Sequence, residues 1–330
     1  MTDSIQGAAQ DRFDEWVLPP LHDCYYLTGA TASGKTPLAL EIATRLDAEI
    51  ISLDSMAIYR GMDIGTAKPS LEERKRIPHH LIDIVDPIES YSVSSYVMAA
   101  HEAAAEIRGR GKKVLICGGT PLYLKSLIRG LFLGPEADWE FRESVESDIQ
   151  AYGEEALLAR LKQVDPLLSH KLHPHDHRRI IRALEVAKVT GSPLSHWQQQ
   201  FDKPAPKNRC PVAVLKIDRA WLHTRINTRV DQMLEQGLVG DVEQLQSLHG
   251  QLGRTALQAV GYREVIEHQS GKLDAKEMVE AIKAHTRQFA RRQEIWFRGL
   301  RELEWCEVSP EKTADSTVNE IIEFFHSSHR

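Results

Sequence analysis

The segment Gly29-Ala30-Thr31-Ala32-Ser33-Gly34-Lys35-Thr36 has the spacing of a phosphate-binding P-loop, glycine-x4-Gly-Lys-Ser/Thr. Residues 24–28 before it predict a short buried strand, and residues 38–46 after it predict a helix. In a strand–loop–helix unit the glycines let successive backbone N–H groups point inward, and the helix start adds partial positive charge. The segment therefore predicts a polyphosphate site in an α/β fold.

The residues of this loop have expected roles. Lys35 supplies a mobile positive charge to the phosphates, and the Thr36 hydroxyl ligates a Mg²⁺ ion that bridges them. The motif does not say which diphosphate or triphosphate binds, and a glycine-rich turn before an ordinary helix is the alternative interpretation. We expect the phosphates to contact Gly29, Thr31, Ala32, Ser33, Gly34, Lys35 and Thr36.

The composition is that of an ordinary soluble protein. The 330 residues are 42% hydrophobic and 27% charged, which suits about two domains. Residues 1–20 have neither a basic start nor an apolar signal segment, and no apolar run of about 18 residues follows. We therefore expect a cytoplasmic protein without membrane association. We also expect a monomer. Widely spaced cysteines predict reduced thiols rather than a disulfide framework or zinc site at Cys24, Cys117, Cys210 and Cys306.

The charge is unevenly distributed along the chain. A formal net charge of −6 argues against a protein that coats nucleic acid. Basic residues nevertheless outnumber acidic ones between residues 168 and 230, and a second basic stretch covers residues 283–301. A local surplus of this kind favours a defined polyanion site, whereas solvated helix faces are the alternative.

Strand-like and helix-like segments alternate over residues 21–134, which predicts a parallel sheet with helices on both faces. We expect strands at residues 24–28, 49–53, 81–85 and 114–117, and a helix at 95–108. Residues 135–204 have helical spacing without strands and predict a helical insertion domain. The core domain resumes over residues 205–308, with a strand at 212–217 and helices at 221–236, 239–248, 257–269 and 275–298. A flexible extension at 1–20 and a tail at 309–330 flank these domains.

Two of the predicted strands end in polar residues. Asp54 follows the strand at residues 49–53, and Thr120 follows two glycines after the strand at 114–117. Because ligands of parallel sheets bind at the carboxyl ends of strands, both residues should lie beside the P-loop. Asp54 is a candidate general base or magnesium partner, with a helix N-cap as the alternative. Thr120 is a candidate phosphate contact, with a tight turn as the alternative.

Two groups in the second half of the chain also have informative spacing. Arg225 and Arg229 lie one turn apart on a predicted helix, so the two cations can bind one anion together. Four histidines surround Pro174 at an i, i+2 spacing that fits no common zinc pattern, and no cysteine lies nearby. The spacing therefore does not indicate a metal site at His170, His173, His175 and His177.

The segment from Asp54 to Pro69, DSMAIYRGMDIGTAKP, resembles the tRNA dimethylallyltransferases, also called isopentenyl-tRNA transferases. Further segments look like motifs of this family and occur in the family's order. The resemblance covers about residues 22–300, and so many ordered motifs are far more specific than a P-loop alone. Besides the P-loop, these segments are HHLIDIVDP at 79–87, GGT and LY within 118–123, HPHD and RALEV within 173–186, LHTRI at 222–226, VGYR at 260–263, and TRQ through Trp296.

The resemblance implies an activity and a set of site residues. The P-loop would bind the diphosphate of dimethylallyl diphosphate with Mg²⁺, and the dimethylallyl group would move to N6 of the adenosine 3′-adjacent to the anticodon. Asp54 would accept the N6 proton or orient the amine, and Arg225 would also bind the diphosphate. The implied catalytic residues are Asp54, Lys35, Thr36, Thr120 and Arg225. The tRNA anticodon stem-loop is expected to contact Asp54, Ser55, Met56, Ala57, Thr120, Arg142, Arg178, Arg179, Arg182, Gly261, Tyr262, Arg263, Arg287 and Arg291.

The sequence departs from the family pattern at four positions. Ala57 replaces a glutamine whose amide is expected to hydrogen-bond the target adenine, and Ala30, His175 and Asp241 replace a proline, an asparagine and a glutamate. Two other functions fit part of the chain. A small-molecule kinase would use the same loop for ATP but leaves the basic insertion unexplained. An RNA-binding protein gated by nucleotide would not need Asp54.

Overall fold

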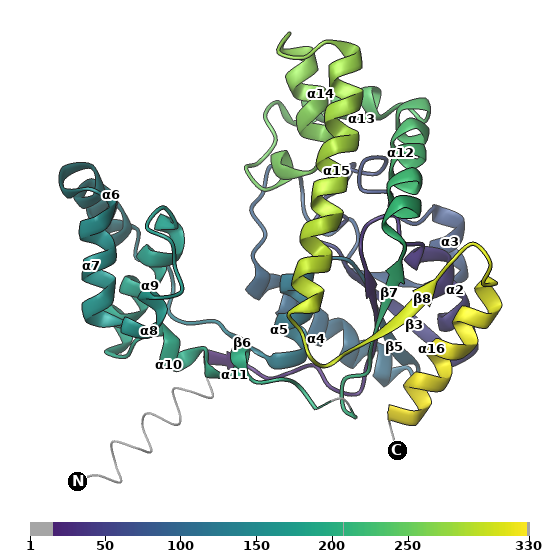
Figure 1. Cartoon of the computed structure of the whole chain (residues 1–330), viewed down its shortest axis with the longest axis horizontal. Helices are drawn as coiled ribbons and strands as arrows, with labels where there is room; N and C mark the ends of the chain where they lie inside the picture. Colours follow the sequence, from purple (N-terminus) through teal and green to yellow (C-terminus); the bar gives the residue numbers. More distant parts are fainter. Residues whose placement is uncertain (1–15, 207, 329–330) are drawn as a thin grey trace. The chain divides into compact units, whose positions relative to one another are not determined.

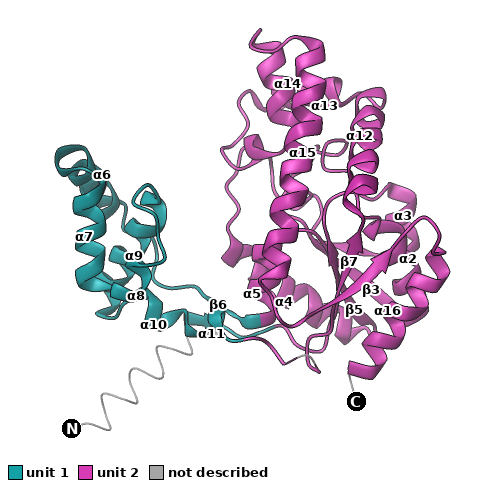
Figure 2. Cartoon of the chain, in the orientation of Figure 1, with its two compact units in different colours: residues 1–20, 129–203 teal, residues 21–128, 204–330 magenta. Residues whose placement is uncertain are grey.

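The computed structural model describes residues 16–206 and 208–328 (Figure 1). The chain divides into two compact units, which Figure 2 shows in different colours. Unit 1 contains Met1–Pro20 and Arg129–Lys203, and unit 2 contains Leu21–Ile128 and Pro204–Arg330. Most of the predicted flexible extension, residues 1–15, lies outside the described residues.

Unit 2 is built on a six-stranded sheet with the strand order β4-β3-β5-β2-β7-β8. All neighbouring strands are parallel, which confirms the predicted sheet. Leu53 at the end of β3 and Thr28 of β2 both pair with Gly118 of β5, so these three strands deliver the segments that follow them to one edge. The strands are β2 (Tyr25–Gly29), β3 (Ala48–Leu53), β4 (His79–His80), β5 (Lys113–Gly118), β7 (Val212–Ile217) and β8 (Leu303–Val308).

Helices cover both faces of this sheet. On one face α2 (Lys35–Leu46) and α16 (Ala314–Ser328) bury Ile42 and Phe325 against Leu115 of the sheet. On the other, α4 (Val93–Gly109) contacts β3 and β5, and the Tyr96 hydroxyl donates a hydrogen bond of 2.9 Å to the carbonyl of Ser52. All six residues of β3 are buried, as expected for a strand covered on both sides. Two shorter helices are α3 (Leu71–Arg76) and α5 (Pro121–Arg129).

A helical bundle completes unit 2 and packs on the segment that follows Asp54. Its buried cluster joins Ile58 and Met62 of that segment to Tyr262 and Ile282. A smaller buried cluster contains Ala32 of the P-loop together with Ile226 and Ala290 of the bundle. These contacts place two helices, α12 (Arg219–Glu235) and α15 (Ala275–Arg298), beside the P-loop. The bundle consists of α12 (Arg219–Glu235), α13 (Leu238–His249), the 3₁₀ turn η1 (Ala256–Gln258), α14 (Tyr262–Gln269) and α15 (Ala275–Arg298).

Unit 1 is helical, with one small antiparallel pair formed by β1 (Val17–Leu18) and β6 (Leu131–Phe132). Its core contains residues that recur at helical spacing, including Leu157 and Leu161 of α7 and Ile180 and Leu184 of α9. The helices are α6 (Trp139–Tyr152), α7 (Glu154–Val164), α8 (Pro166–Ser169), α9 (His177–Thr190), α10 (Leu194–Trp197) and α11 (Gln199–Asp202). None of the helices described in either unit is long and apolar enough to cross a membrane.

Two predicted elements need correction. The strand predicted at residues 81–85 is wrong, because Leu81 and Asp83 have left-handed φ values of 59° and 57°, and only His79–His80 pairs with β3. The helix predicted at 257–269 begins only at Tyr262, since Gly261 has a φ of 100° that ends any earlier helix. Neither β8 nor α16 is predicted from the sequence, and α16 occupies most of the predicted tail at residues 309–330.

Candidate active site

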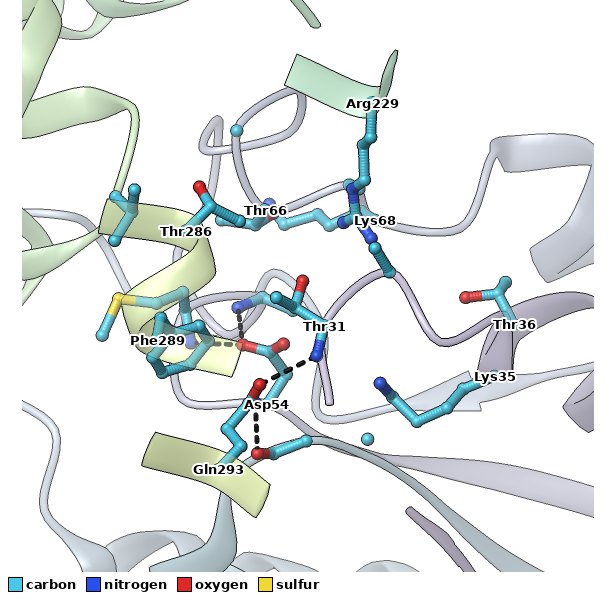
Figure 3. Close-up of a pocket in the computed structure, with 18 of the residues that line it drawn as sticks. Thr31, Lys35, Thr36, Asp54, Thr66, Lys68, Arg229, Thr286, Phe289 and Gln293 are labelled. Atoms are coloured by element: carbon cyan, nitrogen blue, oxygen red, sulfur yellow. Dashed lines mark hydrogen bonds between the residues drawn. The ribbon is translucent and has the colours of Figure 1, made fainter. Parts of the chain in front are cut away.

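A cavity of about 1030 Å³ lies in unit 2 where the P-loop faces α12 and α15. Its lining combines phosphate-binding, acidic and aromatic groups from segments far apart in the chain (Figure 3). From the predicted site, it contains Thr31, Ala32, Gly34, Lys35, Thr36, Asp54, Ser55, Met56, Ala57 and Arg225. The structure therefore brings ten of the predicted diphosphate, catalytic and tRNA-contact residues together around one space.

The P-loop is shaped by two left-handed residues. Gly34 has a φ of 93° and Ala32 a φ of 61°, which turns the backbone into α2. The Lys35 ammonium folds back and donates hydrogen bonds to the carbonyls of Gly29 at 3.0 Å and Ala30 at 2.7 Å. Burial lowers the pKa of Lys35 to about 8. A bound phosphate offers this cation a charged partner in place of two neutral carbonyls.

Arg225 and Arg229 add two cations from α12. Arg225 Nε donates a hydrogen bond of 2.8 Å to the carbonyl of Ala32, and its guanidinium lies 5.2 Å from the centre of the Trp221 ring. Arg229, one turn later, also lines the cavity, and desolvation lowers its pKa. Neighbouring cations in a poorly solvated wall are costly without an anion between them. The sequence predicts the spacing of the two arginines, but it places only Arg225 in the site.

Asp54 reaches the cavity from the end of β3. Its Oδ1 accepts hydrogen bonds from the backbone N–H groups of Met56 at 2.8 Å and Ala57 at 3.3 Å (Figure 3). Oδ2 has no hydrogen-bond partner among residues 16–206 and 208–328. One carboxylate oxygen is thus anchored by the turn, and the other is available to a group in the cavity.

Thr120 supports the turn that carries Asp54. It does not line the cavity, and its hydroxyl accepts a hydrogen bond of 3.0 Å from the backbone N–H of Ser55. Its own N–H donates to the carbonyl of Leu53 at 3.1 Å. Thr120 therefore joins the ends of β3 and β5 and supports the turn that carries Asp54. Gly29 and Ser33 also lie behind the cavity lining, as part of the loop's framework.

Gln293 is a buried site residue that the sequence analysis missed. It is only 4% exposed on α15, where its Oε1 accepts a hydrogen bond of 2.8 Å from the N–H of Thr31. Its Nε2 donates a 2.6 Å hydrogen bond to the carbonyl of Gly119 (Figure 3). One amide therefore connects the P-loop and the glycine turn after β5 to α15. Phe289, one turn earlier on α15, lines the same cavity.

The predicted tRNA contacts of the helical bundle fall into two groups. Tyr262 is fully buried and donates a 2.6 Å hydrogen bond to Asp241, while Gly261 and Arg263 both bond to the buried Glu264. This group supports the bundle's core. Arg287 and Arg291 instead line a groove of about 240 Å³ between α12 and α15, together with Arg219, His223 and Arg298. The groove is the more suitable surface for a phosphate backbone.

The predicted tRNA contacts of unit 1 divide in the same way. Arg142 Nε lies 2.8 Å from the carboxylate of the fully buried Glu185, and Arg182 pairs with the same carboxylate. Both guanidinium groups are thus used inside the unit, where they hold the pKa of Glu185 below its usual range against the effect of desolvation. Arg178 and Arg179 are exposed at the start of α9 and remain candidates for contact with RNA.

The donor set around the P-loop fits Mg²⁺. This ion prefers oxygen ligands and usually keeps several waters while binding substrate phosphates. The Thr36 hydroxyl and the Asp54 carboxylate line the same cavity as the P-loop N–H groups. Among the described residues that line the cavity, the thiol and imidazole donors are the Cys117 thiol, whose pKa burial raises to about 12, and the ring of His79.

Comparisons with known proteins show to which family this chain is similar. Residues 57–300 match the model of the IPP transferase family. A tRNA dimethylallyltransferase of Rhodopirellula baltica is 47% identical, covering 86% of this chain and 88% of the relative; one of Geobacter metallireducens is 44% identical, covering 90% and 96%. The tRNA isopentenylpyrophosphate transferase structure of Bacillus halodurans superposes with a TM-score of 0.67 at 36% identity, covering 93% of this chain and 97% of that one. A eukaryotic dimethylallyltransferase acting on tRNA gives a TM-score of 0.76 at 25% identity, covering 93% and 80%.

Proposed function

The chain belongs to the IPP transferase family of tRNA dimethylallyltransferases, and we propose that it transfers the dimethylallyl group of dimethylallyl diphosphate to N6 of the adenosine 3′-adjacent to the anticodon in tRNA. The observation that carries this proposal is the placement of the Asp54 carboxylate in the same cavity as the P-loop cation Lys35 and Arg225. One wall is suited to a diphosphate and the other to an amine that loses a proton.

The reaction first requires that negative charge on the diphosphate leaving group be stabilised. As the bond between the allylic carbon and the diphosphate oxygen breaks, negative charge grows on the diphosphate. Lys35 leaves the carbonyls of Gly29 and Ala30 to meet this charge, while Arg225 approaches it from α12. We include Arg229 in this cationic wall because it lines the cavity one turn further on. When bound at Thr36, Mg²⁺ supplies further charge neutralisation to the diphosphate.

Positioning of the amine is the second requirement. The exocyclic N6 of adenine is a poor nucleophile, so its alignment with the allylic carbon matters. The anchored Asp54 presents Oδ2 to N6, and accepts the N6 proton as the new carbon–nitrogen bond forms. The adenine must leave its stack to enter the cavity, which is least costly in a single-stranded loop. Arg287 and Arg291 of the groove and Arg178 and Arg179 of unit 1 are the proposed contacts with the RNA backbone.

The direct test mixes the protein with Mg²⁺, radiolabelled dimethylallyl diphosphate and unmodified tRNA, and measures label in the RNA. We expect transfer, and digestion of the product should yield N6-isopentenyladenosine. Phosphate transfer from ATP to a small molecule, with no label in RNA, would replace this proposal with the kinase alternative.

Asp54→Asn supplies the matched mechanistic test. The amide is nearly isosteric and can still accept hydrogen bonds from Met56 and Ala57 through its oxygen. It cannot take a proton from N6, so we expect transfer to fall by at least about 100-fold while tRNA affinity stays unchanged. Normal turnover in this variant would remove Asp54 from its proposed role without excluding prenyl transfer itself.

A further inference from the structure

Unit 1 contains a cluster of metal-ligating side chains that the proposed reaction does not use. Glu154 is the first residue of α7, and His177 is the first residue of α9. His175 lies in the loop just before α9. One ligand atom from each of these three residues lies within 4.8 Å of the other two. The fold thus assembles a carboxylate and two imidazoles from segments about twenty residues apart.

The carboxylate of Glu154 is shared between the two histidines. Its Oε1 lies 2.8 Å from Nε2 of His177, and its Oε2 contacts Nδ1 of His175. His173 supports the arrangement, because its Nδ1 accepts a 3.3 Å hydrogen bond from the backbone N–H of His175 and the two rings lie 4.8 Å apart. We propose that Glu154, His175 and His177 bind a divalent transition-metal ion of the zinc class.

The chemistry of the three groups selects this class of ion. Neutral imidazole nitrogens suit zinc, cobalt, nickel and copper, whereas Mg²⁺ and Ca²⁺ prefer oxygen ligands. Zinc binds nitrogen and oxygen ligands tetrahedrally at about 2.0–2.2 Å, so ligand atoms around one ion are about 3.3–3.6 Å apart. The 2.8 Å contact between Glu154 and His177 must therefore lengthen by less than about 1 Å to admit the ion, and the side chain of His175, which is 70% exposed, is free to move away from the Glu154 carboxylate. Water completes the coordination.

The helix starts set a limit on the strength of this site. The N-termini of α7 and α9 carry partial positive charge, which opposes a cation held by electrostatics alone. The charge of Glu154 and the coordinate bonds of the two imidazoles must offset this repulsion. The bound ion would fasten the loop before α9 to the start of α7, so it would act on the structure of unit 1. This inference does not depend on the proposed reaction in unit 2.

The sequence does not indicate this site. The i, i+2 spacing of the histidines is not that of a common zinc motif, and the third ligand, Glu154, precedes His175 by 21 residues. Only the packing of α7 beside α9 brings the carboxylate to the two rings. His175 also departs from the family resemblance, which has asparagine at this position, so the His175→Asn variant is a natural comparison.

The test uses the full chain without a histidine tag, freed of metal and titrated with Zn²⁺ in the presence of excess Mg²⁺. We expect one Zn²⁺ per chain with a Kd below about 10 μM. Glu154→Gln, His175→Asn and His177→Gln should each weaken binding at least about tenfold. The exposed His170 lies in the same unit but outside the cluster, so His170→Gln should leave the affinity within about twofold.

A second readout identifies the ligands. Co²⁺ bound by nitrogen and oxygen should give visible absorption without thiolate charge-transfer bands, and this absorption should be lost in His175→Asn. Because that side chain is mostly exposed, the variant should keep the wild-type melting temperature in chelator, whereas Zn²⁺ should raise the melting temperature of the wild type alone. A Kd above about 100 μM, equal binding by His170→Gln and the ligand variants, or thiolate bands would overturn the proposal.

Discussion

Gln293→Met isolates the contribution of the buried amide that joins α15 to the P-loop. Methionine has a similar length and apolar volume, but it can neither accept the hydrogen bond from Thr31 nor donate the one to Gly119. Two hydrogen bonds are therefore lost, at about 1 kcal/mol each. The Thr31 N–H borders the cavity and can bond to water, whereas the Gly119 carbonyl loses a buried partner at a further cost of about 1 kcal/mol. We expect the free energy of unfolding of unit 2 to fall by about 3 kcal/mol.

The assay compares Gln293→Met with Gln288→Met, which makes the same substitution at an exposed position of α15. Urea denaturation should show the loss of about 3 kcal/mol for the first variant and a change within about 0.5 kcal/mol for the second. Amide hydrogen exchange should accelerate in the peptide containing Thr31, because the loop loses its attachment. Affinity for a non-reacting prenyl diphosphate analogue should weaken in parallel. If both variants have wild-type stability, exchange and affinity, Gln293 does not position the P-loop.

Three further predictions concern charge, recognition and the C-terminal helix. Diphosphate affinity should fall about tenfold per pH unit above about pH 8, because Lys35, with a pKa of about 8, loses the positive charge that binds the ligand. The guanidinium of Lys35→Arg stays protonated, so calorimetry across this pH range should show no such fall in affinity for that variant. Ala57→Gln should raise tRNA turnover and leave diphosphate affinity unchanged, since the side chain borders the cavity; equal or poorer turnover in single-substrate kinetics would contradict this. Phe325→Ala should destabilise unit 2 by about 3–5 kcal/mol in urea denaturation, because the ring is fully buried and its centroid lies 4.9 Å from that of Tyr25. A loss below about 1 kcal/mol would mean that α16 is not part of the core.

The features that could be predicted from the sequence depend on local interactions. The P-loop needs only glycine conformations, successive N–H groups and the start of α2, so eight adjacent residues define it. The position of Asp54 beside the P-loop could be predicted because the carboxyl ends of parallel strands lie at the same edge of the sheet. The apolar run at residues 81–85 was misleading, since the turn there depends on Asp83 accepting hydrogen bonds from Lys68 and Arg74. Lys68 and Arg74, the second of which lies in α3, precede the run in the sequence, so the pattern of the run itself does not indicate them.

Some missed features did leave a signal. Val318, Ile321 and Phe325 recur at helical spacing and are all buried, so α16 could have been recognised as an amphipathic helix rather than a tail. Charge counting failed for a different reason. It cannot separate Arg142, whose guanidinium is paired with Glu185 inside unit 1, from Arg179, which is exposed on the surface. The pairing of Arg142 depends on Glu185, which lies 43 residues away in the sequence, so a count of charges does not reveal it.

The second basic stretch gains its meaning from the helix that carries it. On α15, Arg287 and Arg291 face the groove, whereas Phe289 and Gln293 face the cavity. Steps of two residues along a helix point to different sides, so one rigid element can present cations to a polyanion and also hold the P-loop. An RNA backbone seated against the groove would therefore be fixed relative to the diphosphate by α15 itself. Gln293 makes this connection direct, since its hydrogen bond reaches the first residue of the loop that lines the cavity, Thr31.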